Sequence, residues 1–191
     1  MRLKLKKSKG LDFIPYKDNK LKKVLYSVLQ IFFGILLLGI SFVISSSGFY
    51  IKPLLFIPIA ICFAMFSEDE LQSSLIGMVC GLLLDISYNK LIGFNGAILL
   101  VMSVFTTIMF KNYFKPMFFN ALIYVSISTF IQGLLDYFFY YKIWALNSND
   151  NVFLIYHKYI FPASIMTIVS IVIIYPIVKG IMVNLKYGTK G

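Results

Sequence analysis

Apolar residues form long uncharged stretches along this chain, separated by short polar connections. A helix needs about 20 apolar residues to cross a hydrocarbon layer of about 30 Å. The pattern predicts six transmembrane helices, near residues 24–46, 50–66, 71–88, 92–110, 117–140 and 159–178. We therefore expect an all-α, polytopic integral membrane protein whose six helices form one bundle.

The second and third predicted helices have the weakest patterns. The second contains Pro53 and Pro58, which interrupt an ordinary helix, so we expect it to be short, kinked or tilted. Only the acidic residues Glu68, Asp69 and Glu70 separate it from the third. Because each carboxylate at membrane depth costs about 2.5–3.5 kcal/mol, we expect an aqueous turn at this acidic triplet.

The basic residues predict how the chain is oriented. Nine of the 18 Lys and Arg residues lie in the first 23 positions. If the N-terminus is cytoplasmic, the cytoplasmic segments hold 14 basic residues and the outer segments hold four, as the positive-inside rule requires. Six crossings then place both termini in the cytoplasm. We divide the chain into a basic N-terminal segment (1–23), a transmembrane domain (24–178) and a cytoplasmic tail (179–191), located in the cell membrane.

Composition and charge narrow the classes of function. Hydrophobic residues make up 59% of the chain and charged residues 14%. Soluble domains carry about 25% charged residues, so the composition argues against a cytosolic enzyme. The net charge of +10 is concentrated beside the first predicted helix, where each base gains about 1 kcal/mol from an anionic leaflet. We therefore expect anionic lipid headgroups, and not nucleic acid, as partners of the N-terminal segment.

Signals for catalysis or metal binding are sparse. His157 is the only histidine, and the chain has neither a P-loop nor a G-x-S-x-G motif. Cys62 and Cys80 lie inside apolar stretches, where cysteine acts as a packing residue. Two cysteines and one histidine cannot complete the usual four-ligand zinc site. We expect no enzymatic activity, no cofactor and no metal.

The most informative stretch joins the third and fourth predicted helices. Gly77, Gly81 and Asp85 are spaced by four residues and so share one helical face. Two glycines on that face allow a neighbouring backbone to approach closely. A short polar connection follows, and Gly93 opens the next helix. The pattern predicts a packing groove, not a phosphate loop.

Asp85 and Asp136 lie near the ends of predicted membrane helices, where burying a carboxylate costs free energy unless it faces the bundle interior, water or a partner. Ser128, Gln132 and Asp136 form a polar stripe at spacing four, and the helix rise places both carboxylates towards the outer leaflet. Three explanations stay open. The aspartates accept hydrogen bonds at helix ends or from loop amides, they contact a partner's membrane segment, or they relay protons or cations.

With these residues in view, the chain resembles the MreD family of bacterial rod-shape-determining membrane proteins. The run from Ile76 to Gly93 looks like that family's pattern of glycine, glycine and aspartate at spacing four, followed by a polar connection and a glycine. The stretch around Asp136 is similar to the family's acidic residue late in the fifth helix. The ending, from Ile160-Phe-Pro162 to Tyr175-Pro176 and a basic tail, also looks like members of the family.

The resemblance implies a non-enzymatic component of the wall-elongation machinery that maintains rod shape. Family members work with MreC above all, and with MreB, the glycosyltransferase RodA and an elongation-specific transpeptidase. Our hypothesis is a scaffold whose binding surface includes the glycine face of the third helix and the ends that carry Asp85 and Asp136. The alternative is the substrate-binding component of an energy-coupling-factor vitamin transporter, to which such proteins look distantly similar.

Overall fold

The computed structural model describes residues 20–47, 52–67, 69–139 and 160–184. Most of the basic N-terminal segment, His157 with its loop and the end of the tail lie outside the described residues. The described part is all-helical, as predicted. Its elements are α1 (Lys20–Ser46), α2 (Phe56–Phe66), α3 (Glu70–Ser87), α4 (Phe94–Asn112), α5 (Phe118–Asp136), α7 (Phe161–Lys179) and the π-helix η3 (Gly180–Asn184).

Four helices of the described chain are long and apolar enough to cross a membrane. They are α3, α4, α5 extended to Phe139, and α7 extended to Met182. Their bounds differ by only a few residues from those expected at 71–88, 92–110, 117–140 and 159–178. α1 has 27 residues and begins at Lys20, four residues earlier than expected, and its apolar part runs from Ile31 to Ser46.

The second predicted helix is shorter than its expected range of 50–66. α2 begins only at Phe56 and has 11 residues, which reach about 16 Å, or half of a hydrocarbon layer. Pro58 lies in its first turn, where no backbone N–H is needed as a helix donor. The expectation of a short element is confirmed. The expected start at residue 50 is wrong, since the helix begins only at Phe56, after Pro53.

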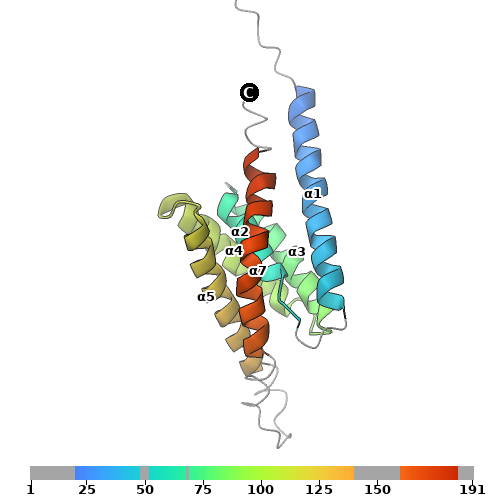
Figure 1. Cartoon of the computed structure of the whole chain (residues 1–191), viewed down its shortest axis with the longest axis vertical. Helices are drawn as coiled ribbons and strands as arrows, with labels where there is room; N and C mark the ends of the chain where they lie inside the picture. Colours follow the sequence, from blue (N-terminus) through green and yellow to red (C-terminus); the bar gives the residue numbers. More distant parts are fainter. Residues whose placement is uncertain (1–19, 48–51, 68, 140–159, 185–191) are drawn as a thin grey trace, which may run out of the picture.

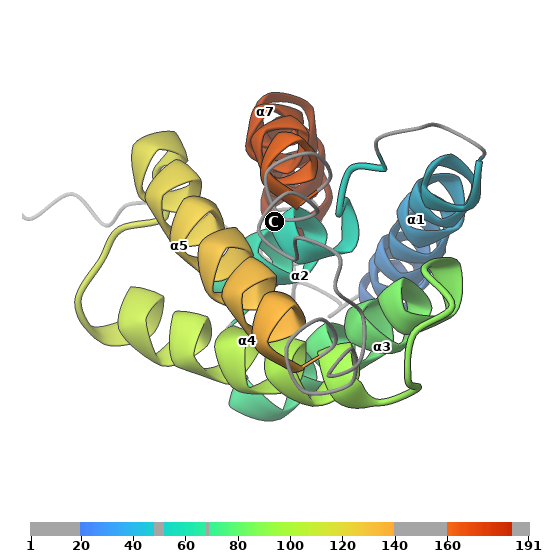
Figure 2. The same ribbon diagram turned by 90° about the horizontal axis from the view of Figure 1, so that it is seen from below.

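α2 occupies the centre of the molecule, with α3, α4, α5 and α7 in contact with it (Figure 2). Nearly every residue of α2 is buried, from Phe56 to Met65. A helix that is apolar all round is stable only when other elements surround it. Thr107 of α4 donates a hydrogen bond to the Ala64 carbonyl (2.9 Å), and the Leu54 N–H donates to Thr167 of α7 (2.8 Å).

The predicted turn at the acidic triplet is confirmed. α2 ends at Phe66 and α3 begins at Glu70, and both Asp69 and Glu70 are exposed. This turn lies at the same end of the molecule as the α4–α5 connection, because Glu70 lies 3.9 Å from Lys111 near the end of α4. The start of α1 and the end of α7 also lie at this end (Figure 1).

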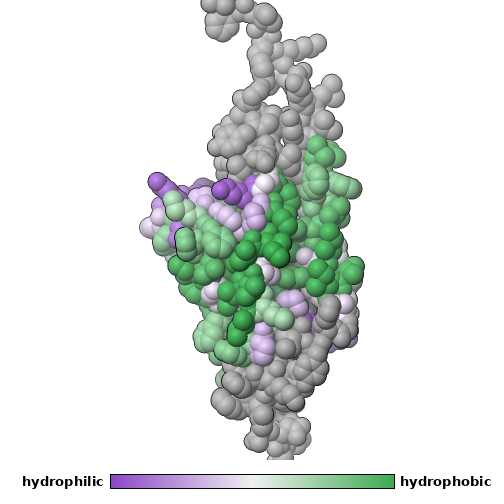
Figure 3. All heavy atoms as spheres, viewed as in Figure 1, coloured by the Kyte–Doolittle hydropathy of each residue, from purple (hydrophilic) through white to green (hydrophobic). Residues whose placement is uncertain are grey.

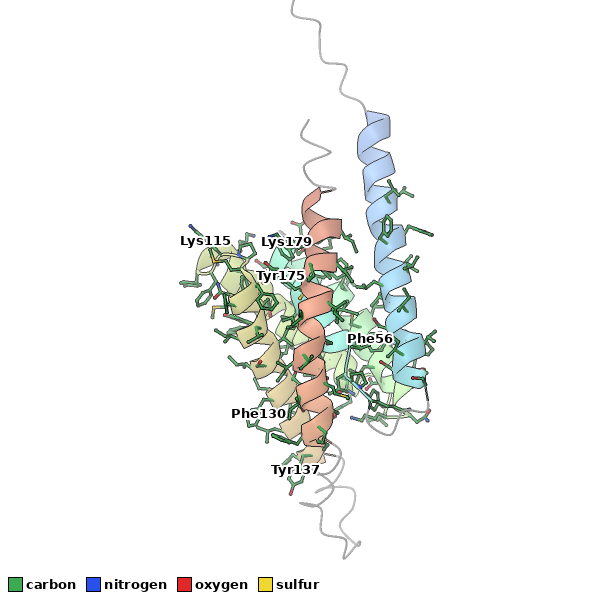
Figure 4. All side chains as sticks on the ribbon, in the orientation of Figure 1. Phe56, Lys115, Phe130, Tyr137, Tyr175 and Lys179 are labelled. Atoms are coloured by element: carbon green, nitrogen blue, oxygen red, sulfur yellow. The ribbon has the colours of Figure 1, made fainter. Side chains whose placement is uncertain are left out.

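The outer surface is apolar, unlike that of a soluble protein, and the interior holds polar groups beside a hydrophobic core. Figure 3 shows a broad hydrophobic face over the middle of the molecule. On α5, for example, Phe119, Ile123 and Phe130 are all more than half exposed. Figure 4 shows Phe130 directed away from the bundle and Phe56 inside it. The same figure places Lys115 and Lys179 at one end and Tyr137 at the other.

Candidate functional site

The glycine face of α3 packs directly against the backbone of α4. A Cβ added to Gly77 would lie 2.6 Å from the Leu99 carbonyl oxygen and in collision with the Ser103 hydroxyl. A Cβ added to Gly81 would collide with the Asn95 carbonyl and come within 2.5 Å of the Gly96 Cα. The predicted close backbone approach is present, and the neighbour is α4 of the same chain. A partner protein therefore has no access to this face, so our hypothesis of a docking surface there is wrong.

Asp85 closes the hairpin between α3 and α4. Its side chain is fully buried, and its Oδ2 accepts a hydrogen bond from the Gly93 N–H (2.8 Å). Its Oδ1 accepts one from the Asn95 N–H (3.3 Å). Both donors belong to the start of α4, where free N–H groups and the helix dipole favour a negative charge. Asp85 thus matches the first of the three explanations, a carboxylate that binds amides at a helix end.

Gly93 is required by the shape of this turn. Its φ of +101° lies in the left-handed region, which a side chain strains and glycine adopts freely. The Lys90 N–H donates to the Asp85 carbonyl (2.9 Å), so both the backbone and the side chain of Asp85 hold the connection. The short polar loop between the two helices is therefore built around a single buried aspartate.

Two contacts connect this hairpin to α5. The Lys90 Nζ lies 2.5 Å from the Asp136 Oδ2 in an ion pair whose side chains are mostly buried. The Gln132 Nε2 donates to the Asn95 Oδ1, and both amides are fully buried. The polar stripe predicted on α5 thus faces the interior, and Gln132 and Asp136 each meet one residue of the α3–α4 hairpin.

Among the residues that the structure describes, three buried polar atoms of this cluster find no hydrogen-bond partner. They are the Asn95 Nδ2, the Gln132 Oε1 and the Asp136 Oδ1. An unpaired buried polar atom costs about 1–3 kcal/mol, so a protein retains one only where something else compensates. A bound water or a small polar ligand has the donors and acceptors to form hydrogen bonds with these three atoms.

Tyr88 links the cluster to the segment that precedes α2. Its hydroxyl donates to the Lys52 carbonyl (2.7 Å), and the ammonium groups of Lys52 and Lys90 lie 5.9 Å and 5.6 Å from its ring centroid. Tyr88 therefore ties the cluster to the chain that leads into α2.

Sequence reasoning did not identify Lys90, Asn95 or Tyr88 as members of this site. Lys90 was counted only among the four basic residues of the outer segments. No sequence signal pairs it with Asp136, which lies 46 positions further along the chain. The described residues contain no group of three or more His, Cys, Asp or Glu side chains arranged to hold a metal ion.

The fold and this site define an all-helical protein of membrane-spanning character, with a buried polar cluster at one end of its bundle. No protein-family model, no curated protein and no solved structure matches the chain.

Proposed function

We propose that this protein is a non-enzymatic scaffold of the bacterial wall-elongation machinery, a protein of the MreD type that helps to maintain rod shape. The observation that carries the proposal is that Gly77, Gly81, Asp85 and Gly93 build one structural unit. These are the residues on which the resemblance depends, and each has a distinct role in holding α3 against α4.

The proposed arrangement has six crossings, with both termini on the cytoplasmic side of the cell membrane. Two observations support it. The start of α1 and the end of α7 lie at one end of the molecule, together with Lys115 and Lys179 (Figures 1 and 4). The short α2 reaches about 16 Å and is buried among α3, α4, α5 and α7, so it forms the proposed second crossing together with residues 52–55, which turn rather than extend (Leu55 N–H to the Pro53 carbonyl, 2.9 Å).

Such a broken crossing is acceptable in a membrane where other helices bury it. Non-helical backbone at membrane depth must find its hydrogen bonds inside the protein. Leu54 and Leu55 are buried, and the Leu54 N–H is satisfied by Thr167. In this arrangement the N-terminal segment (1–23) lies against anionic headgroups, and Asp85 and Asp136 lie near the outer leaflet.

The surface that we assign to partner binding is the exposed side of α1. α1 stands at the edge of the molecule (Figure 2), and Phe32, Leu36 and Val43 are between 44% and 68% exposed. A Cβ added to Gly39 would meet nothing within 4 Å. A glycine on an exposed membrane helix lets another helix approach closely. We expect the single transmembrane helix of MreC to pack here, with MreB, RodA and the transpeptidase joining through the complex.

The test is affinity purification of the tagged chain in mild detergent, followed by mass spectrometry. Recovery of MreC and RodA with the wild type, and their loss with Gly39→Leu, supports the scaffold and its surface. A Cβ at Gly39 meets nothing within 4 Å among the described residues, so we expect Gly39→Leu to fold, and its abundance and thermal stability serve as the control. If both forms recover the same partners, α1 is not the partner-binding surface. If neither form recovers an elongation protein, the proposed scaffold function is wrong.

One observation favours the alternative function. The unpaired atoms of Asn95, Gln132 and Asp136 could bind a small polar solute, as the substrate-binding component of a vitamin transporter does. In the same purification, such a component would bring down paired ATPase subunits and an integral coupling protein. The two functions are therefore separated by a single experiment.

A further inference from the structure

The two halves of α5 are held to the bundle by different kinds of group. The proximal half, residues 118–127, packs on the hydrophobic core through Phe118, Ala121, Leu122, Tyr124 and Val125. The distal half, residues 128–136, ends beside Tyr137 at the opposite end of the molecule from Lys115 (Figure 4). Its buried residues are four polar ones and a glycine, namely Ser128, Thr129, Gln132, Gly133 and Asp136. Apolar packing therefore fixes the proximal half, and polar groups hold the distal half.

Aromatic rings anchor the proximal half on both sides. The Tyr124 ring lies 4.9 Å from the Phe110 ring of α4 and 5.9 Å from the Phe114 ring, measured between centroids. The Phe118 ring lies 5.5 Å from the Tyr175 ring of α7, in an edge-to-face arrangement. Aromatic pairs at such distances attract each other beyond the effect of the area that they bury. The proximal half is thus attached to the neighbouring chain on both sides by direct ring contacts.

The polar groups of the distal half are only partly paired. Asp136 forms its ion pair with Lys90, and Gln132 donates its hydrogen bond to Asn95. Within the described ranges, four buried atoms in and beside the distal half find no hydrogen-bond partner. They are the Thr129 Oγ1, the Gln132 Oε1, the Asp136 Oδ1 and the Asn95 Nδ2. Water would form hydrogen bonds with all four, so the contact between the distal half and the bundle forms at a cost in free energy.

The ion pair lies at the end of the distal half, where water is near. The side chains of Lys90 and Asp136 are 17% and 7% exposed. Removing two charges from water costs about as much free energy as their attraction returns, so hydration of the separated charges competes with the pair. α5 stands at the edge of the molecule in both views (Figures 1 and 2). An outward movement of its distal half therefore displaces no other described helix.

We propose that the distal half of α5 is a gate, which moves away from the α3–α4 hairpin and admits water to Asn95, Gln132 and Asp136. The proximal half, fixed by its aromatic contacts, is the pivot. The structure described above is the closed state. In the open state, water forms hydrogen bonds with the four atoms that are unpaired in the closed state. This inference goes beyond the proposed function, because it concerns a movement within the chain and needs no partner protein.

The experiment measures how fast single cysteines react in the purified full chain, held in lipid nanodiscs so that both ends of the bundle meet water. Thr129→Cys places a thiol in the distal half, and Val125→Cys places one a helical turn away in the proximal half. Both positions are fully buried. The reagent is a charged methanethiosulfonate, which needs a thiolate in contact with water and leaves buried thiols unlabelled. Mass spectrometry of peptides follows the labelling of each cysteine with time.

We expect Thr129→Cys to be labelled about tenfold faster than Val125→Cys or more, because the distal half opens without the proximal half. The native Cys62 of α2 and Cys80 of α3 are fully buried and report unfolding of the whole bundle. They should stay unlabelled while position 129 reacts. Equal labelling rates at positions 129 and 125 contradict the gate. Labelling of Cys62 and Cys80 at the rate of position 129 also contradicts it, since the whole bundle then opens.

Changes to the ion pair sharpen the test. Lys90→Met removes the cation that holds Asp136, so labelling at position 129 should become about tenfold faster or more. Adding Asp136→Leu replaces the pair by two apolar side chains that gain nothing from water, and labelling should return to the original rate or below. An unchanged rate in Lys90→Met, or a double variant as fast as the single one, contradicts the proposal. If Thr129→Cys is not monodisperse, the fully buried Gln132 is replaced by Cys and serves as the reporter.

Discussion

The α3–α4 hairpin and α1 use glycine in opposite ways. In the hairpin, Gly77 and Gly81 lie against the α4 backbone so closely that no side chain fits. On α1, a Cβ added to Gly34 would lie 3.8 Å from its nearest neighbour outside the helix, and one added to Gly39 would meet nothing within 4 Å among the described residues. The same residue type therefore marks a completed helix contact in one region and an unfilled surface in the other.

The difference follows from the forces that act inside a bilayer. Lipid tails are as apolar as leucine, so apolar helices associate through close packing and polar contacts rather than through the hydrophobic effect. The hairpin has both, in its glycine contacts and in the hydrogen bonds of Asp85. Between α1 and the neighbouring part of the bundle there is instead a groove. This contrast is why we assign partner binding to α1.

Gly81→Leu should have the largest effect of any single change in this comparison. The new side chain meets the backbone of Asn95 and Gly96, which cannot move without displacing α4. We expect a loss of more than about 3 kcal/mol in the free energy of unfolding, measured by titration with sodium dodecyl sulfate. Gly39→Leu introduces the same side chain on α1 and should change the free energy of unfolding little. If both variants lose the same free energy of unfolding, the hairpin and α1 do not differ in how tightly their glycines are packed.

Lys90→Met should have the next largest effect. It leaves the buried carboxylate of Asp136 without its cationic partner at 2.5 Å, and such losses cost about 3 kcal/mol. The double variant Lys90→Met with Asp136→Leu removes both charges and should regain most of the stability. A double variant that loses as much as the sum of its single variants would show that the pair is not coupled.

Asp85→Asn should have a smaller effect. The amide keeps one oxygen for the two N–H groups that start α4, and it removes the negative charge from the helix N-terminus. We expect a loss of about 2 kcal/mol by the same titration. Asp69→Asn alters an exposed carboxylate and should stay within about 0.5 kcal/mol of the wild type. If Asp85→Asn lowers the free energy of unfolding no more than Asp69→Asn does, the Asp85 carboxylate does not stabilise the α3–α4 hairpin.

The long helices were predictable because each needs only a long apolar run. The bounds of α3, α4, α5 and α7 follow the uncharged stretches to within a few residues. α2 was harder, because its uncharged run, residues 53–67, is short and contains two prolines. Pro53 and Pro58 limit its length, and its central position depends on contacts with helices distant in sequence.

The candidate site was predictable in part. Spacing by four identified Gly77, Gly81 and Asp85 as one face, and Gln132 with Asp136 as another. Spacing within one helix does not show which other helix a face meets. The assignment of the glycine face to a partner failed for that reason, because α4 of the same chain covers it. Lys90 and Asn95 were missed because their role depends on the distance across the bundle to α5.

The most direct test of the account is photo-crosslinking in cells from a reactive amino acid placed at position 39 of α1. If α1 is the partner surface, we expect a specific cross-link to a wall-elongation protein, MreC first, and only lipid adducts from the same amino acid at Ile173 on α7. Lipid adducts alone at both positions, with no protein captured at position 39, would contradict the claim that α1 is the surface on which partners assemble.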